Sequence, residues 1–182
     1  MVSLLEKICK GWNFTGMDSR GHSGGLAIGW CSRTIKVIND WGFDSGLRIK
    51  VFVEDLVSCI TIINVYGPSQ DRVPFWDNLF NKYFLENEDL ILGGDLNFSL
   101  GEAESWGPIA HPDNQAGFFS HLMASNGLID VAPLKMLPTW KNMRTGEARV
   151  TKILDRFLIF EPIAMLPLQF RQRIGSRGEL DH

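Results

Sequence analysis

The sequence predicts an α/β protein in which two mixed β-sheets pack face to face, with helices on the outside. Short strand-like segments follow one another closely in the first third of the chain, which favours antiparallel hairpins. Helix-like segments then separate the later strands without a regular strand–helix alternation, which argues against an all-parallel sheet. Hydrophobic periodicity alone does not separate this arrangement from other α+β layouts.

Length and composition favour a single domain, residues 1–182. The formal net charge of −3 argues against an extended basic surface for nucleic acid, although it is compatible with a local basic cleft. The three cysteines show no Cys-x-x-Cys spacing, which predicts neither a disulfide framework nor a zinc site and favours a reducing compartment. The sequence shows neither a signal peptide nor an apolar run of roughly twenty residues, so we expect a soluble intracellular protein.

The first third of the chain predicts one short helix and a run of strands. Val2, Leu5 and Ile8 recur at helical spacing within the segment that ends at about Trp12. The glycine-rich segment 16–25 predicts a loop. Four short segments rich in β-branched and aromatic residues then predict an antiparallel meander: LAIGWC (26–31), TIKVIND (34–40), LRIKVFV (47–53) and CITIINVY (59–66).

The rest of the chain mixes helix and strand patterns. Segment 72–85 places aromatic and leucine side chains on one helical face, and segment 114–127 predicts a second helix closed by Asn126-Gly127. Segment 89–95, DLILGGD, is a continuous apolar run that ends in glycines, as in a strand buried on both faces. The remaining predicted strands are LIDV (128–131), PTWKN (138–142), ILDRFLIF (153–160) and LQFRQRI (168–174).

Asp95 and Asn97 are the first candidates for chemistry, because they follow that buried strand. Residues two apart in an extended chain point to the same side, so a carboxylate and an amide arrive together at the edge of a sheet. Gly93 and Gly94 leave room for a ligand or another backbone. The carboxylate can accept a proton from water, and the amide can donate to a developing oxyanion. The alternative is an ordinary turn, in which Asp and Asn serve backbone hydrogen bonding.

Tyr66 and Asp155 each have a functional and a structural interpretation. The phenol of Tyr66, before the turn at Gly67-Pro68, can bind a phosphate, or its ring can lie in the core with the hydroxyl at the rim. Asp155 interrupts an apolar strand, and a buried carboxylate needs a partner. Strand alternation sends Arg156 to the opposite face, so a histidine is the predicted partner. The alternative for Asp155 is an exposed position on an edge strand.

The last residues, Glu-Leu-Asp-His, add a second acid and a histidine. If Asp181 and His182 lie beside Asp95 and Asp155, three carboxylates crowd one place and cannot all stay ionised without cations. Mg²⁺ and a protonated imidazole would balance them, which is the composition of a phosphate-ester site. Asp155 would then orient His182 through one ring nitrogen.

Six collinear motifs resemble the endonuclease/exonuclease/phosphatase superfamily, and most closely the endonuclease domain of plant LINE-type non-LTR retrotransposons. They cover nearly the whole chain: HSGGLAIGW, NVYGP, LGGDLN, PTWKN, ILDRFLI and the terminal DH. The resemblance implies a DNase I-like fold, a four-layer sandwich of two packed mixed β-sheets flanked by helices. It also implies hydrolysis of phosphodiesters with Mg²⁺, or Mn²⁺ in its place, and in this branch the nicking of nuclear DNA.

The resemblance assigns the following catalytic roles. Asp95 would orient or deprotonate the attacking water, and Asn97 would hold the phosphate and that carboxylate in register. Asp155 would orient His182, which would bind the scissile phosphate. Asp181 would help to hold the metal.

The resemblance also implies contacts with the substrate. Tyr66 would touch the phosphate or the leaving group. Thr139 and Asn142 would lie along the rim that faces DNA, and Trp140 would be packed. DNA is the expected partner, and no membrane contact is expected.

The chain also departs from the pattern of that family. The glutamate that is the family's principal metal ligand has no counterpart, because Glu6 falls in the following helix, and Leu180 replaces a serine before Asp-His. We therefore expect a domain that lacks the first strands and the last strand, truncated at both ends, with weak or absent activity. The alternatives are a non-catalytic remnant or binding module of the same fold, and a sibling phosphatase for a small phosphorylated substrate.

Overall fold

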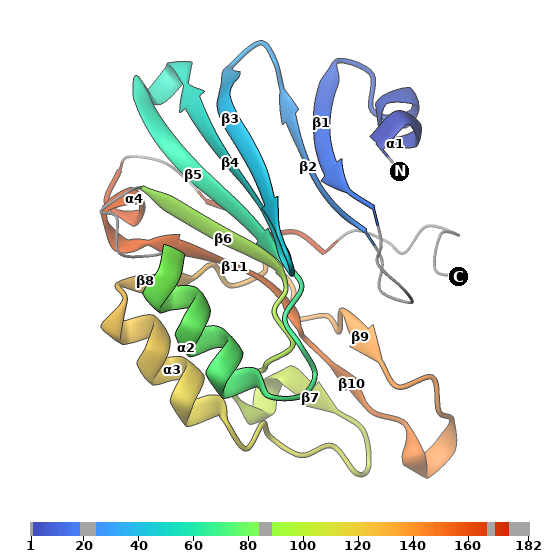
Figure 1. Ribbon diagram of the computed structural model, residues 1–182. Coiled ribbons are helices and arrows are strands. Elements are labelled where there is room, and N and C mark those ends of the chain that lie inside the picture. Colours follow the sequence, from blue (N-terminus) through green and yellow to red (C-terminus); the bar gives the residue numbers. More distant parts are fainter. Residues whose placement is uncertain (1, 19–24, 84–88, 167–169, 175–182) are drawn as a thin grey trace.

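The computed structural model describes residues 2–18, 25–83, 89–166 and 170–174. The helices are α1 (Val2–Ile8), α2 (Arg72–Tyr83), α3 (Ala116–Ser125) and α4 (Glu161–Ala164) (Figure 1). The strands are β1 (Trp12–Met17), β2 (Leu26–Cys31), β3 (Ile35–Phe43), β4 (Gly46–Val53), β5 (Ser58–Val65), β6 (Leu90–Asp95), β7 (Ser105–Trp106), β8 (Leu128–Asp130), β9 (Trp140–Lys141), β10 (Thr151–Lys152) and β11 (Asp155–Phe160). Single-turn 3-10 helices lie at Glu54–Leu56, Glu102–Glu104 and Gly146–Ala148.

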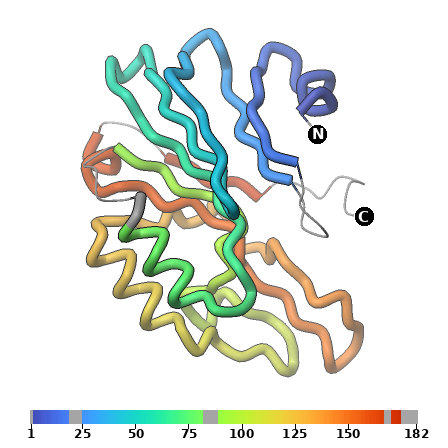
Figure 2. Tube along the Cα trace, viewed as in Figure 1, coloured from blue at the N-terminus to red at the C-terminus, as the bar shows by residue number. Residues whose placement is uncertain are grey.

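The largest described sheet has six strands in the order β3-β4-β5-β6-β11-β8. All neighbouring pairs are antiparallel except β5 and β6, which run parallel and are joined through α2. The parallel pair places the carboxyl ends of β5 and β6 side by side (Figure 2). Strands β1 and β2 form a separate antiparallel hairpin, and β7, β10 and β9 form a small third sheet.

Helices α2 and α3 cover one face of the six-stranded sheet (Figure 1). The core beneath them contains Trp76, Leu92, Phe98, Phe119 and Leu158, all almost fully buried. The rings of Phe98 and Phe119 stack with their centroids 4.2 Å apart. Full burial of each such side chain contributes roughly 1.5–3 kcal/mol, so this layer is a main source of stability.

The opposite face of the sheet is covered by the β1–β2 hairpin. Ile28 of β2 packs against Ile49 and Val51 of β4 and Ile60 of β5, and Ile163 of α4 joins this cluster. Helix α1 lies beside β1, away from the large sheet (Figure 1). The arrangement of two sheets flanked by helices confirms the predicted fold class.

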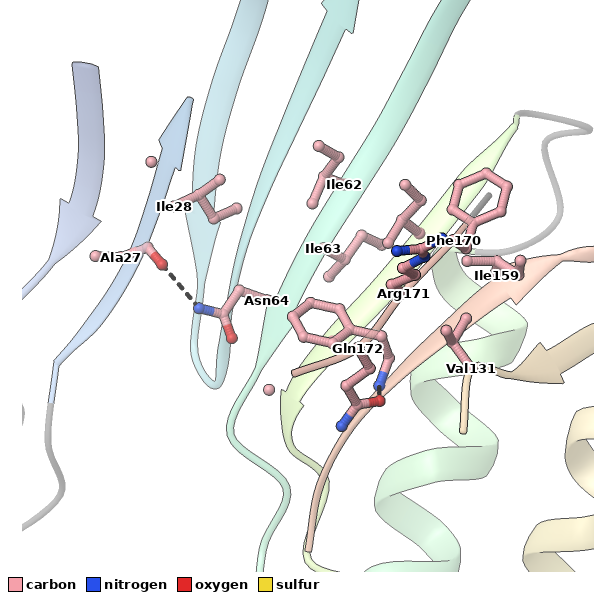
Figure 3. A pocket seen from close by; sticks show the side chains of 15 residues that line it. Ala27, Ile28, Ile62, Ile63, Asn64, Val131, Ile159, Phe170, Arg171 and Gln172 are labelled. Carbon is pink, nitrogen blue, oxygen red and sulfur yellow. Dashed lines mark hydrogen bonds between the residues drawn. The ribbon is translucent and has the colours of Figure 1, made fainter. Parts of the chain in front are cut away.

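A cavity of about 480 Å³ opens between the hairpin and the strands β5, β6 and β11. Its lining is mainly apolar and includes Ile28, Ile62, Ile159 and Phe170, while the side-chain amide of Asn64 donates to the carbonyl oxygen of Ala27 at its rim (3.0 Å; Figure 3). Neither Asp95 nor Asp155 lines it, although Gly93 and Gly94, which directly precede Asp95, do.

Most predicted elements are confirmed, and the differences have local causes. LAIGWC pairs with the unpredicted strand β1, so the predicted four-strand meander contains only β3, β4 and β5. Gly11, with a φ of +84°, separates α1 from β1, so the helix ends before the predicted limit at Trp12. The described part of LQFRQRI forms only an isolated bridge, Pro133 with Gln172. None of the described helices is long and apolar enough to cross a membrane.

Candidate active site

Asp95 and Asp155 lie directly opposite each other, at the end of β6 and the start of β11. Gly94 shapes this corner. A side chain at position 94 would place its Cβ 2.2 Å from the carbonyl oxygen of Val65, and the φ of Gly94 is +124°. Glycine therefore allows β6 to approach the end of β5 closely, which brings Asp95 next to the turn at Gly67. The backbone N–H of Gly67 donates to the carbonyl oxygen of Asp95 (2.7 Å).

The pKa of Asp95 is raised from 3.8 to about 6. Burial of the carboxyl group is the main cause, and the negative charge of Asp155 raises the pKa further. A hydrogen bond from the backbone N–H of Asn97 to Oδ1 of Asp95 (3.1 Å) acts in the opposite direction. A carboxyl group with this pKa exchanges protons with water close to neutral pH, which is the property that a general base needs.

Asn97 forms a left-handed turn after Asp95, with a φ of +55°. Its Nδ2 donates to the carbonyl oxygen of Gly67 (2.6 Å), so the amide ties the loop after β6 to the loop after β5. Its backbone carbonyl accepts a hydrogen bond from Nη1 of Arg72 (2.8 Å). The structure therefore brings Asp95 and Asn97 together as predicted, but directs one amide N–H of Asn97 to the backbone.

Tyr66 lies in the same corner, directly after β5. Its backbone N–H donates to the carbonyl oxygen of Ser45 (2.9 Å), and the residue is 40% exposed. The residue is therefore partly accessible at the end of β5, next to the turn at Gly67 that contacts Asp95.

Asp155 is exposed, so the expectation of a buried carboxylate was wrong. Strand β11 lies between β6 and β8, but its pairing with β8 begins only at Leu158, which leaves its first residue uncovered on that side. The hydroxyl of Thr139 accepts hydrogen bonds from the backbone N–H groups of Leu154 (3.0 Å) and Asp155 (3.1 Å). Thr139 therefore holds the start of β11 in place.

Arg156 points to the opposite face, as strand alternation predicts. It is 2% exposed, and its guanidinium contacts Oε2 of Glu104 (2.7 Å) and Oδ2 of Asp130 (2.8 Å). This buried cluster was not predicted, because Glu104 and Asp130 lie in segments without a recognisable motif.

The residues of the PTWKN motif lie at a projecting hairpin formed by β9 and β10 (Figure 1). Nδ2 of Asn142 donates to the carbonyl oxygen of Ala148 (2.8 Å), and its Oδ1 accepts from the backbone N–H of Val150 (3.1 Å). Asn142 thus closes the loop of the hairpin. Trp140 is 38% exposed, contrary to the expectation that it is packed, because the two-residue strand β9 is an edge of the small sheet.

The predicted histidine and second acid, His182 and Asp181, lie outside the described residues. Within the described ranges, no group of three His, Cys, Asp or Glu side chains could hold a metal ion. The described part of the site therefore offers two carboxylates, Asp95 and Asp155. Mg²⁺ typically takes one or two carboxylates from a protein and completes its shell with water and phosphate oxygens, so the donor type fits that ion.

Comparisons with known proteins identify the fold. No family model matches the sequence, and no curated protein matches it significantly. Among solved structures, the chain is similar to the endonuclease domain of TRAS1, a telomere-specific non-LTR retrotransposon, with a TM-score of 0.63 and 16% identity over 86% of this chain and 70% of that one.

Two further solved structures are similar over 90% of this chain and 71% of their own. An AP endonuclease from Archaeoglobus fulgidus has a TM-score of 0.66 and 18% identity. The 3′ phosphatase NExo from Neisseria, bound to product DNA hairpin, has a TM-score of 0.60 and 17% identity. Another similar structure is an endonuclease/exonuclease/phosphatase family protein from Bacteroides thetaiotaomicron. At these identities the similarity shows the fold, which is the DNase I-like fold that the resemblance implied.

Proposed function

We propose that this chain hydrolyses phosphodiester bonds of DNA, as an endonuclease that nicks one strand. The observation that carries the proposal is the pair Asp95 and Asp155 at an accessible corner of the sheet, in which Asp95 has a pKa of about 6. Several proteins with this fold are nucleases, and two of the similar structures hold DNA products. The motifs that resemble plant LINE-type retrotransposons support an origin in such an element and a nuclear substrate.

In this proposal Asp95 accepts the proton of the attacking water. Its raised pKa makes it a stronger base than an ordinary aspartate, while a substantial fraction is still ionised near neutral pH. Asn97 holds this carboxylate by its backbone N–H and fixes the neighbouring turn through its side chain. Tyr66, exposed beside them, contacts the phosphate or the leaving group.

Asp155 and the end of the chain complete the proposed site. Asp155 orients His182, which binds the scissile phosphate, and Asp181 contributes a metal ligand. A bound Mg²⁺, or Mn²⁺, would supply Lewis-acid stabilisation of the charge that develops on the phosphate. The two described carboxylates provide negative charge that attracts such a cation.

The projecting hairpin provides a surface for DNA. Lys141, Arg144 and Arg149 are exposed on it, and Trp140 is partly exposed at its base. This group of cations lies in a chain whose formal net charge is −3, so it is a local basic region of the kind that binds phosphates. Thr139 and Asn142 support the same hairpin, which is consistent with their proposed place along the DNA-facing rim.

The test is the conversion of supercoiled plasmid to open circles by the purified chain with Mg²⁺ or Mn²⁺. We expect slow nicking that EDTA abolishes and that falls by about 100-fold or more in Asp95→Ala, because the proton acceptor is lost. Asp130→Asn is the matched control, since Asp130 belongs to the buried cluster around Arg156, and it should nick at the wild-type rate.

Two outcomes would contradict the proposal. Equal nicking by Asp95→Ala would identify a contaminating nuclease. A folded wild-type chain that leaves plasmid intact with either metal ion would exclude hydrolysis by this chain. If that inactive chain still bound DNA, the alternative of a non-catalytic binding module would replace the proposed activity.

A further inference from the structure

We infer that the ion pair of Arg72 and Asp113 positions the turn that carries Asp95 and Asn97, and thereby sets the turnover rate of the proposed site. This inference rests on the proposed function. Neither residue belongs to a motif that suggested chemistry, and both lie outside the acidic corner itself. Their geometry connects that corner to the helix layer of the protein.

The pair is bidentate and nearly buried. Nη1 of Arg72 lies 2.6 Å from Oδ2 of Asp113, and Nη2 lies 2.7 Å from Oδ1. The side chains are 16% and 5% exposed, respectively. Two parallel hydrogen bonds fix the plane of the guanidinium as well as its position, which a single contact would not do. The guanidinium also lies over the ring of Phe119, with Cζ 5.3 Å from the ring centroid.

The orientation of Arg72 matters because the same guanidinium reaches the active-site turn. Nη1 donates to the carbonyl oxygen of Asn97 at 2.8 Å, in addition to its bond with Asp113. Asn97 has a left-handed backbone, a conformation that Asn adopts more readily than most non-glycine residues. The hydrogen bond from Arg72 helps to hold this turn, together with the bonds to Gly67 and Asp95.

Asp113 is held independently of Arg72, so it can act as the fixed end of this connection. Its carboxylate accepts hydrogen bonds from the backbone N–H groups of Gln115 (2.9 Å) and Ser99 (3.3 Å). Burial acts to raise the pKa of Asp113, but the hydrogen bonds from Arg72 and the backbone outweigh it and hold the pKa below the usual value. Asp113 therefore stays ionised at neutral pH.

The connection joins three segments that are distant in the sequence. Arg72 opens α2, Asn97 follows β6, and Asp113 precedes α3. Asn97 in turn donates its backbone N–H to Asp95, the proposed base. Loss of the Arg72 contact should let this turn move, so that Asp95 and the bound phosphate meet less often in a reactive geometry. The expected consequence is a lower kcat rather than weaker DNA binding.

The experiment compares Arg72→Lys and Asp113→Asn with the wild-type chain and with Asp130→Asn. Lysine keeps the positive charge but lacks the fork, and asparagine keeps the size of Asp113 but lacks its charge. Asp130→Asn disturbs a different buried ion pair beside the same sheet and has no contact with Asn97. Plasmid nicking supplies kcat and KM, and a ¹H–¹⁵N NMR spectrum reports the backbone amide of Asn97.

We expect kcat to fall by about 10- to 100-fold in Arg72→Lys and Asp113→Asn, with KM changed by no more than about twofold. We also expect the Asn97 amide signal to move in both variants and to stay in place in Asp130→Asn. Wild-type kcat in folded variants, or an effect on KM alone, would overturn the inference. If the wild-type chain does not nick DNA, the proposed function fails. The Asn97 signal then tests by itself whether Arg72 and Asp113 position the turn: an unchanged signal in both variants overturns this role, and a shifted signal supports it.

Discussion

Two acidic clusters meet on neighbouring residues of β11, and they differ in how their charge is balanced. On one face, Asp155 lies opposite Asp95 at the corner of the sheet. On the other face, Arg156 is buried between Glu104 and Asp130. The alternation of a strand thus places an open acidic pair and a cluster with an internal cation one residue apart.

The two clusters show that a raised pKa does not by itself identify a catalytic carboxylate. Burial raises the pKa of both Asp95 and Asp130. Arg156 opposes that effect at Asp130, whereas no basic side chain of the described residues contributes to the shift at Asp95. The positive charge that balances Asp95 can therefore come from an external cation or a proton. The buried cluster stabilises the fold, and the open pair is the candidate for function.

The largest effect should follow from removing the internal cation. Arg156→Met keeps much of the side-chain volume but leaves Glu104 and Asp130, whose side chains are 13% and 22% exposed, without their cationic partner. We expect the free energy of unfolding to fall by about 3–5 kcal/mol, the usual range for breaking a buried pair from one side. Chemical denaturation measured at neutral pH checks this value. A loss below about 1 kcal/mol, typical of exposed pairs, would mean that the two clusters are not different in kind.

At the open pair we expect a smaller change in stability of opposite sign: removing the charge of Asp95 should stabilise the fold. The pKa of Asp95 is about 6 in the folded chain against an ordinary value of 3.8, so the folded state holds the proton more tightly between those values. The stability contributed by the protonated form is therefore lost as pH rises from about 4 to about 6. Asn in place of Asp95 carries no charge and can still accept the hydrogen bond from Asn97. We expect the free energy of unfolding of Asp95→Asn at pH 7 to exceed that of the wild-type chain by about 1–3 kcal/mol.

Denaturation at two pH values separates this explanation from a simple packing effect. The gain in Asp95→Asn should disappear near pH 4, where the carboxyl group of the wild-type chain is protonated. A gain that is equal at both pH values would show that charge is not the cause. A loss of stability in Asp95→Asn at pH 7 would show that the carboxylate of Asp95 stabilises the fold, contrary to a role in function at the expense of stability.

The strongly periodic segments explain why the fold could be predicted from the sequence. The buried strand β6 and the helices α2 and α3 follow hydrophobic patterns that local physics determines. Strands β9 and β10 have two residues each, which is too short for a periodic signal, and β1 lies between the predicted first helix and the predicted glycine-rich loop, which it overlaps only at its last two residues. The main layers could therefore be predicted from the sequence, whereas the pairing of the first hairpin could not.

The candidate site was predicted in part for a similar reason. Asp95 and Asn97 are only two residues apart, so their proximity could be predicted, although Asn97 lies in a left-handed turn after β6 and not in the extended chain that the prediction assumed. The contact of Arg72 with Asp113 joins residues 41 apart, which no local pattern reveals. Asp155 was expected to be buried because its neighbours are apolar, but its position at the start of β11 leaves it exposed.

The pH dependence of plasmid nicking is the most direct test of the proposed role of the open pair. If Asp95 accepts the proton of water, the rate should rise with pH through an apparent pKa at or below about 6, because only the ionised carboxylate is a base. Asp155→Asn removes the neighbouring negative charge, so its residual activity should rise at lower pH than that of the wild-type chain. A rate that is flat between about pH 4 and pH 8, or a midpoint that Asp155→Asn leaves unchanged, would contradict the assignment of Asp95 as the base of a coupled carboxylate pair.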